Sequence, residues 1–257
     1  RNNPVFSVIK HLAVMRRILF WTVGLALTLT QFSCDFDFDD GIGPCVRGNG
    51  NTVSRDLNLP DFTGVDLDIS AEVIITQGDN FKVTVEGESN IIAELERDVR
   101  NGIWEIDFDR CVRDMDELTI FITMPRVRSL SISGSGIITS TNIMKVDDID
   151  LSISGSGKID VGLDADDISS RISGSGRVVL EGESNSVEHT VSGSGDLFAF
   201  LLQTRDADIR VSGSGNSEVN VSDNLTVRIS GSGDVYYRGK PQVEVSVSGS
   251  GKLVNAN

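Results

Sequence analysis

The sequence contains few of the residues that catalytic and metal sites use most often. It has two histidines and three cysteines in 257 residues, and one histidine, His11, falls in a segment that we expect to be removed. The expected body, from Cys45 onward, then keeps one histidine and two isolated cysteines, whereas a structural zinc centre takes four ligands, so none is expected. The sequence also lacks a Gly-x-Ser-x-Gly motif, and no Lys-Ser or Lys-Thr follows its glycine-rich stretches. Neither a hydrolase nucleophile nor a phosphate-binding loop is therefore indicated.

Proline and aromatic residues are also scarce. Five prolines and 6% aromatic residues accompany 26 glycines. Such a chain builds its core from Val, Ile and Leu and changes direction with glycine, which favours β structure.

Cationic residues are outnumbered. The chain has 23 Lys and Arg against 38 Asp and Glu, a formal net charge of −15. Such a surface repels nucleic acid, so no nucleic-acid partner is expected. We interpret the charge as a solvated acidic coat, with a specific cation-binding role as the alternative.

Residues 1–33 are expected to be an export signal with an upstream extension. From Met15, the expected start, two arginines and an apolar stretch lead to Cys34 in the sequence MRRILFWTVGLALTLTQFSC. This arrangement is typical of a secretory signal and is too short for a spanning helix. The ending TQFSC resembles a relaxed bacterial lipobox, although Gln31 departs from the usual apolar residue. Acylation of Cys34 and attachment to a membrane through the lipid are therefore expected, with plain secretion as the alternative.

The remaining cysteines lie in the expected folded body. Residues 34–44 are acidic and contain glycine, which is typical of a tether. The body then begins at Cys45. Cys45 and Cys111 form an even pair in an exported chain, which favours a structural disulfide between them.

The second part of the body repeats one tetrapeptide. SGSG occurs seven times at intervals of 18 to 21 residues, and the residue before each copy is Ile or Val. The first glycines of the copies are Gly134, Gly155, Gly174, Gly193, Gly213, Gly231 and Gly249. A constant β-branched neighbour at a regular interval indicates a solenoid with one buried column.

Each repeat contains a strand with apolar residues at every second position, followed by SGSG and a second short strand. Rungs of this length close as turns of a parallel β-helix and stack at about 4.8 Å. SGSG is then the corner of each rung. Glycine adopts positive φ there and lets neighbouring backbones approach, and the serines can bond nearby backbone or each other.

Residues 45–128 have a less regular pattern and are expected to form irregular β-rich rungs, continuous as one domain with the repeats of 129–257. Asn101-Gly102 between apolar runs indicates a hairpin. One helical turn is expected near Asn90.

Polar residues recur in two columns. One column precedes each strand and places Asp147 and Asp148 beside Asp166 and Asp167 on the next rung. Four neighbouring carboxylates could bind calcium, but Asp also favours corners, and we expect a solvated corner and no metal. The other column follows each SGSG and is mixed in charge, with Arg177 and Asp196 as a candidate cross-rung ion pair.

No catalytic residue is expected. His189 falls in an inward column, where a core role is favoured over catalysis. Trp104, Tyr236 and Tyr237 could form a sugar-stacking platform, but isolated aromatic residues more often complete a core or a cap.

Several ordered motifs carry a family resemblance. CVRGNGN at the start of the body, FTGVDLDISAEVIITQGD, LTIFITMP and the serial ISGSG repeats resemble the auto-transporter adhesin head domain family, the GIN-repeat proteins of Bacteroidota. The resemblance covers nearly everything from Cys45 onward. It implies an all-β, right-handed parallel β-helix at the cell surface, and it supplies no catalytic residue.

We therefore expect a non-enzymatic, lipid-anchored cell-envelope protein that serves as a scaffold for adhesion or surface interaction, with a glycan or protein partner and no cofactor. It is expected to be exported to the outer membrane, on its periplasmic or surface face. The alternatives are a carbohydrate-binding or polysaccharide-degrading β-helix, and an envelope accessory in signalling or stress. The final rung, followed only by KLVNAN, could leave strand edges open for self-association.

Overall fold

A computed structural model describes residues 45–257. The leader, Cys34 and the expected tether of residues 34–44 lie outside the described residues. The elements are β1 (Val46–Arg47), β2 (Thr52–Leu57), β3 (Gly64–Leu67), β4 (Glu72–Gln77), β5 (Lys82–Glu88), α2 (Ser89–Ile92), β6 (Val99–Arg100), β7 (Ile103–Ile106), β8 (Val112–Arg113), β9 (Thr119–Met124), β10 (Ser129–Ile132), β11 (Ile137–Gly155), β12 (Lys158–Gly174), β13 (Arg177–Gly193), β14 (Asp196–Gly213), β15 (Ser217–Gly231), β16 (Val235–Gly239), β17 (Gln242–Gly249) and β18 (Leu253–Asn255).

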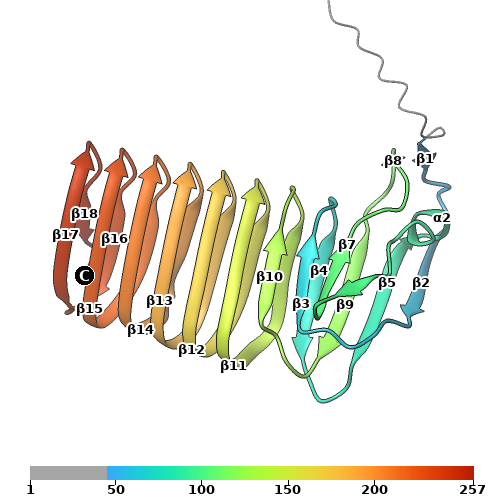
Figure 1. Cartoon of the computed structure of the whole chain (residues 1–257), viewed down its shortest axis with the longest axis horizontal. Coiled ribbons are helices and arrows are strands. Elements are labelled where there is room, and N and C mark those ends of the chain that lie inside the picture. Colours follow the sequence, from blue (N-terminus) through green and yellow to red (C-terminus); the bar gives the residue numbers. More distant parts are fainter. Residues whose placement is uncertain (1–44) are drawn as a thin grey trace, which may run out of the picture. The chain divides into compact units, whose positions relative to one another are not determined.

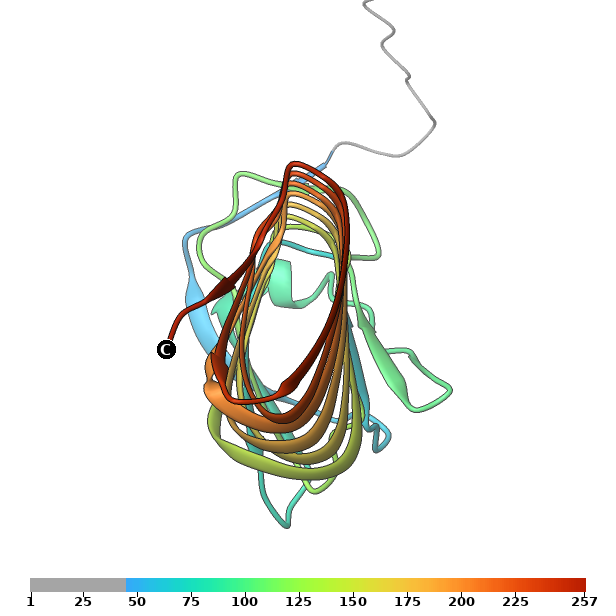
Figure 2. The same cartoon turned by 90° about the vertical axis from the view of Figure 1, so that its left-hand side faces the viewer.

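The repeats form a solenoid of parallel rungs (Figure 1). From β10 to β15 each strand pairs in parallel with the next, and β15 then pairs in parallel with both β16 and β17. The register aligns equivalent repeat positions, as in Ile153 with Ile172 and Ile172 with Val191. In Figure 2, seen from the C-terminal end, each turn rises on the right, crosses the upper corner and descends on the left toward the viewer. The expected right-handed parallel β-helix is confirmed.

The inward side chains form one aliphatic core along the solenoid. The residues before SGSG are buried in every rung from β10 to β15, with exposed fractions of 2% or less. In the second half of the rung, Ile159, Val178 and Leu197 form an equally buried column. Because each rung buries its side chains against the next, stability is nearly a sum over neighbouring rungs.

The SGSG corners stack by backbone contact. Gly193 has φ 131°, and a Cβ there would overlap the carbonyl oxygen of Gly174 on the preceding rung. The neighbouring amide of Ser194 donates a 2.8 Å hydrogen bond to the same oxygen. The corner therefore requires glycine for its backbone angle and for the closeness of the stack. The serines at this corner face solvent.

The N-terminal part adds further rungs beyond β10 and β11 and closes that end of the solenoid. β3 and β7 extend one sheet beyond β10, and β4 and β9 extend the other beyond β11. The pairing becomes antiparallel at β6, β5 and β2, which closes this end. The expected hairpin at Asn101-Gly102 joins β6 to β7, and α2 is the expected helical turn.

The disulfide lies at this closed end. Cys45 and Cys111 are joined with their Cα atoms 4.7 Å apart, beside the short parallel pair of β1 and β8. Residues 43–257 form one compact unit, and the described residues hold its strands, core and disulfide, so the body is a self-contained folding unit. In this part of the chain, no helix is both long and apolar enough to cross a membrane.

Candidate functional site

A hollow in two parts lies along the corner opposite SGSG, and we call it the corner furrow. One part has a volume of about 600 Å³ and is lined by residues 126–128, 145–148, Asp150 and 164–166. The adjoining part, about 340 Å³, is lined by 164–166, 183–185, 203–205 and Ser222. The two parts share Asp164, Ala165 and Asp166. The furrow therefore crosses β11 to β15, four rung steps or about 19 Å.

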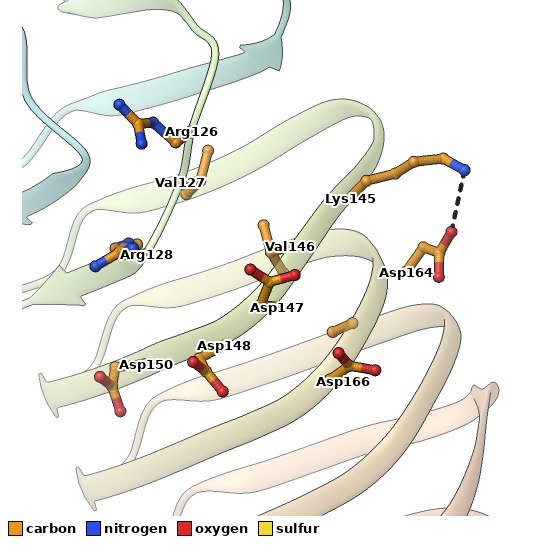
Figure 3. Close-up of a pocket in the computed structure, with 11 residues that line it drawn as sticks. Arg126, Val127, Arg128, Lys145, Val146, Asp147, Asp148, Asp150, Asp164 and Asp166 are labelled. Atoms are coloured by element: carbon orange, nitrogen blue, oxygen red, sulfur yellow. Dashed lines mark ion pairs between the residues drawn. The ribbon is translucent and has the colours of Figure 1, made fainter.

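Two arginines stand at one end of the furrow (Figure 3). Arg126 and Arg128 lie on the segment between β9 and β10, on either side of Val127, which is 1% exposed and packs in the core. Buried Val127 fixes the segment, and the alternation leaves both guanidinium groups exposed to solvent. Neither arginine forms an ion pair with any residue from 45 to 257. Both are therefore available to a bound anion.

Carboxylates occupy the next rungs of the furrow. Asp147, Asp148 and Asp150 project from β11, and Asp164 and Asp166 project from β12 (Figure 3). Each is exposed to solvent. They lie at the bend of each rung, because Asp favours turns over the interior of a strand.

The four calcium candidates are close neighbours. Asp148 and Asp167 are paired in register, but Asp167 accepts a hydrogen bond from the Ser186 hydroxyl, and Asp166 accepts one of 2.6 Å from the Asn185 amide. No group of three or more His, Cys, Asp or Glu among the described residues is arranged to hold a metal ion. Protein donors thus already serve two of the four carboxylates.

The furrow suits an extended hydrophilic ligand. Drug-like ligands prefer enclosed apolar pockets, whereas this hollow is open and lined mostly by charged and polar groups. Arginines can bind carboxylate or sulfate groups in a bidentate manner, and aspartates can accept hydrogen bonds from hydroxyl groups. In the second part, buried Ser184 has a hydroxyl oxygen without a hydrogen-bond partner among residues 45–257.

His189 lies in the core, as predicted. It is 0% exposed, and its Nδ1 is 3.1 Å from the hydroxyl of Ser170 on the preceding rung. Burial lowers the pKa of the ring from 6.5 to about 4. A neutral, buried ring cannot reach a substrate, so it supplies no general base for the exposed SGSG serines.

The aromatic residues singled out in the sequence do not come together. Trp104 is buried in the N-terminal part and donates a 3.1 Å hydrogen bond to the Glu96 carbonyl. Tyr237 packs against the core, whereas its neighbour Tyr236 lies on the outer face, with its hydroxyl 3.4 Å from an Asp234 carboxylate oxygen. No shared sugar-stacking platform results from these three.

A different aromatic pair was missed. Phe198 and Phe200 lie on the outer face of β14, where Arg177 stacks over Phe198 at 5.4 Å and Arg238 over Phe200 at 4.1 Å from the ring centres. Arg177 and Asp196 are register neighbours but form no ion pair in the described part. The alternation in DLFAFLL was the available signal, because it places both rings outward.

Comparison with protein families gives a match over most of the body. The model of the family described as “Putative auto-transporter adhesin, head GIN domain” matches residues 61–241. No curated protein shows significant similarity to the chain.

Solved structures share the fold at low identity. A “putative adhesin” from Bacteroides fragilis NCTC 9343 has a TM-score of 0.78 at 23% identity, covering 82% of this chain and 99% of that one. A “putative adhesin” from Parabacteroides distasonis ATCC 8503 has a TM-score of 0.67 at 22% identity, with coverage of 82% and 99%. A “putative lipid binding protein” from the same strain has a TM-score of 0.63 at 21% identity, covering 82% and 100%. At these identities the likeness concerns the fold alone.

Proposed function

We propose a surface-interaction function from the premise that this chain belongs to the “Putative auto-transporter adhesin, head GIN domain” family, whose model covers residues 61–241. The protein is a non-enzymatic component of the cell envelope, exported and attached to the outer membrane through acylated Cys34. Its β-helix holds the corner furrow as a rigid binding surface for adhesion.

The observation that carries the proposal is the combination of a rigid, repetitive frame with one long charged furrow. A groove of about 19 Å along a solenoid corner matches a linear polymer better than a compact molecule. Sugar hydroxyls can donate to the aspartates, and acidic groups can bind Arg126 and Arg128. The ligand class that fits is therefore an extended glycan bearing carboxylate or sulfate groups.

The binding test uses the body, residues 45–257, on arrays of acidic and neutral glycans and of extracellular-matrix proteins, in calcium and in EDTA. Saturable binding of acidic glycans is expected. The Arg126→Ala/Arg128→Ala variant should weaken it by at least about 100-fold, since it removes two charge-assisted hydrogen bonds that each contribute ~1.5–3 kcal/mol. The matched control is Arg55→Ala/Arg113→Ala, which removes the same charge from two exposed arginines outside the furrow.

Equal binding by the furrow variant and its control would refute the furrow as the site. Glycan binding by a Phe198→Ala/Phe200→Ala variant would then test whether the aromatic pair is the binding site instead. A calcium requirement lost in Asp147→Asn/Asp148→Asn would assign a calcium role to that column. Absence of binding by the folded body to every glycan would overturn the glycan assignment.

Polysaccharide degradation is the second candidate, because the furrow places carboxylates and arginines together. A bound acidic polysaccharide incubated with the body would release new reducing ends if the furrow cleaved it. Chains of unchanged length would support binding without cleavage.

A further inference from the structure

The last rung exposes side chains that every earlier rung buries. Val243, Val245 and Val247 of β17 are 41%, 48% and 45% exposed. Their register partners on β15, Leu225, Val227 and Ile229, are 1%, 0% and 2% exposed. The three valines thus continue the inward column of the core and are covered on one side only.

The backbone edge beside these valines is also open. β17 pairs with β15, whereas β18 pairs with β16 in the other half of the rung, so no strand among the described residues covers the outer edge of β17. Edge strands are usually protected by several charged side chains, especially lysines, or by a bulge, a proline or a covering segment. β17 reads QVEVSVSG and has one charge, Glu244, which lies on the outer face between the inward valines, and it has no lysine, bulge or proline.

The opposite end of the solenoid is closed. There β5 and β6 pair antiparallel to β9 and β7, β2 covers β5, and α2 buries Ile91 and Ile92. The edge strands at that end, β2 and β6, carry Arg55, Asp56 and Arg100, so the open end of one copy stacked on this end of another would meet a charged edge. Only two open ends can satisfy each other, which favours a closed dimer over a filament.

We propose that β17 is a homodimer interface, in which two copies join end to end by antiparallel pairing of β17 about a two-fold axis at Val245. In this register Val245 faces its own copy, and Val243 faces Val247 of the second copy. Glu244 faces Ser246, so no like charges oppose each other. The aliphatic column then runs without interruption through both bodies.

The dimer extends beyond the proposed function because it doubles the binding surface. Two furrows on one rigid rod would engage a repeating polymer at two places, which raises the overall affinity without new contacts. The interface itself needs no ligand, so it can be tested whether or not the furrow binds glycan.

The first test is the mass of the body in solution by size-exclusion chromatography with light scattering, over a range of concentrations. Twice the monomer mass at micromolar concentration is expected. Val245→Lys should raise the dissociation constant by at least about 100-fold, because it buries two like charges at the axis. Ser246→Lys is the matched control; it adds the same charge on the outer face, opposite Glu244, and should leave the dimer intact.

A cross-linking test does not depend on destabilisation. The body has no cysteine outside the Cys45–Cys111 disulfide, so Val245→Cys should form a single covalent dimer on oxidation. Thr226→Cys, one rung inward, should not. A strict monomer at every concentration with no Val245→Cys cross-link would overturn the proposal, and a dimer equally stable in Val245→Lys would place the interface elsewhere.

Discussion

His189 shows how the solenoid sets the chemistry of a single residue. Its column holds Leu151, Ser170 and Ile209 on neighbouring rungs, so the ring has one polar partner, the Ser170 hydroxyl. The other ring nitrogen, Nε2, has no partner among the described residues. The sequence predicted the inward position from the period of two, but not the bond, which depends on Ser170 occupying the same column one rung earlier.

The lowered pKa makes stability depend on pH. The folded ring stays neutral down to about pH 4, whereas the unfolded ring takes up a proton below about 6.5. The unfolded state therefore binds more protons between these values, and the folded state loses stability as the pH falls through this window. This loss in the free energy of unfolding reaches about 3 kcal/mol and levels off below pH 4.

Replacing the pair by apolar residues should remove this contribution. We expect Ser170→Val/His189→Ile to lose less stability than the original protein between pH 7 and 4.5, because the variant has no ring that takes up a proton on unfolding. Urea unfolding at the two pH values measures the difference. An equal loss in both proteins would show that His189 is not the group responsible, and that the surface carboxylates account for the pH dependence.

At the scale of the element, the rungs were predictable and the furrow was not. Each strand and SGSG corner carries its own local signal, so the register, the buried columns and the Asn101-Gly102 hairpin followed from spacing. The furrow depends on where the segment with Arg126 and Arg128 lies against β11 and β12, which no local pattern specifies. The stacking of Arg238 on Phe200 likewise depends on a register shift between Ala199 and Gln203 of β14.

The same motif position should tolerate alanine differently along the stack. Gly193→Ala would force a positive φ and overlap the Gly174 carbonyl, so we expect a loss of about 3 kcal/mol or more. Gly134 opens the first corner outside the positive-φ region, and a Cβ there would lie 3.2 Å from the Asp68 carbonyl oxygen. Gly134→Ala should therefore cost about 1 kcal/mol.

Chemical unfolding followed by circular dichroism compares the two variants. Ser194→Ala serves as a control, since it changes an exposed side chain at the same corner as Gly193. Equal losses for Gly193→Ala and Gly134→Ala would contradict the role assigned to the stacked carbonyls.

At the scale of the whole molecule, the net negative charge bears differently on membrane attachment and on partner binding. Residues 1–33 hold four of the 23 cationic residues and no acidic residue, so the chain from Cys34 onward has 19 cationic and 38 acidic residues, a net charge of −19. Such a body is repelled by anionic lipid. The proposed function therefore assigns attachment to acyl chains at Cys34 and assigns recognition of an acidic partner to local cations such as Arg126 and Arg128.

This division predicts that Cys34→Ser releases the protein from the membrane. Acyl chains contribute ~0.8 kcal/mol for each buried CH₂ group, and an acidic body offers no electrostatic substitute. Both proteins are expressed in a bacterium that processes lipoproteins, and the membranes are fractionated. We expect the variant in the soluble fraction and the original chain in the membrane fraction. The first control, Cys111→Ser, removes the disulfide and should stay in the membrane fraction. The second, Gln31→Leu, brings the site closer to the usual lipobox and should be acylated at least as completely as the original chain. Retention of Cys34→Ser in the membrane fraction would show that attachment does not depend on this cysteine. It would refute the anchoring proposal and leave the proposed binding surface unaffected, because that surface is argued from the furrow alone.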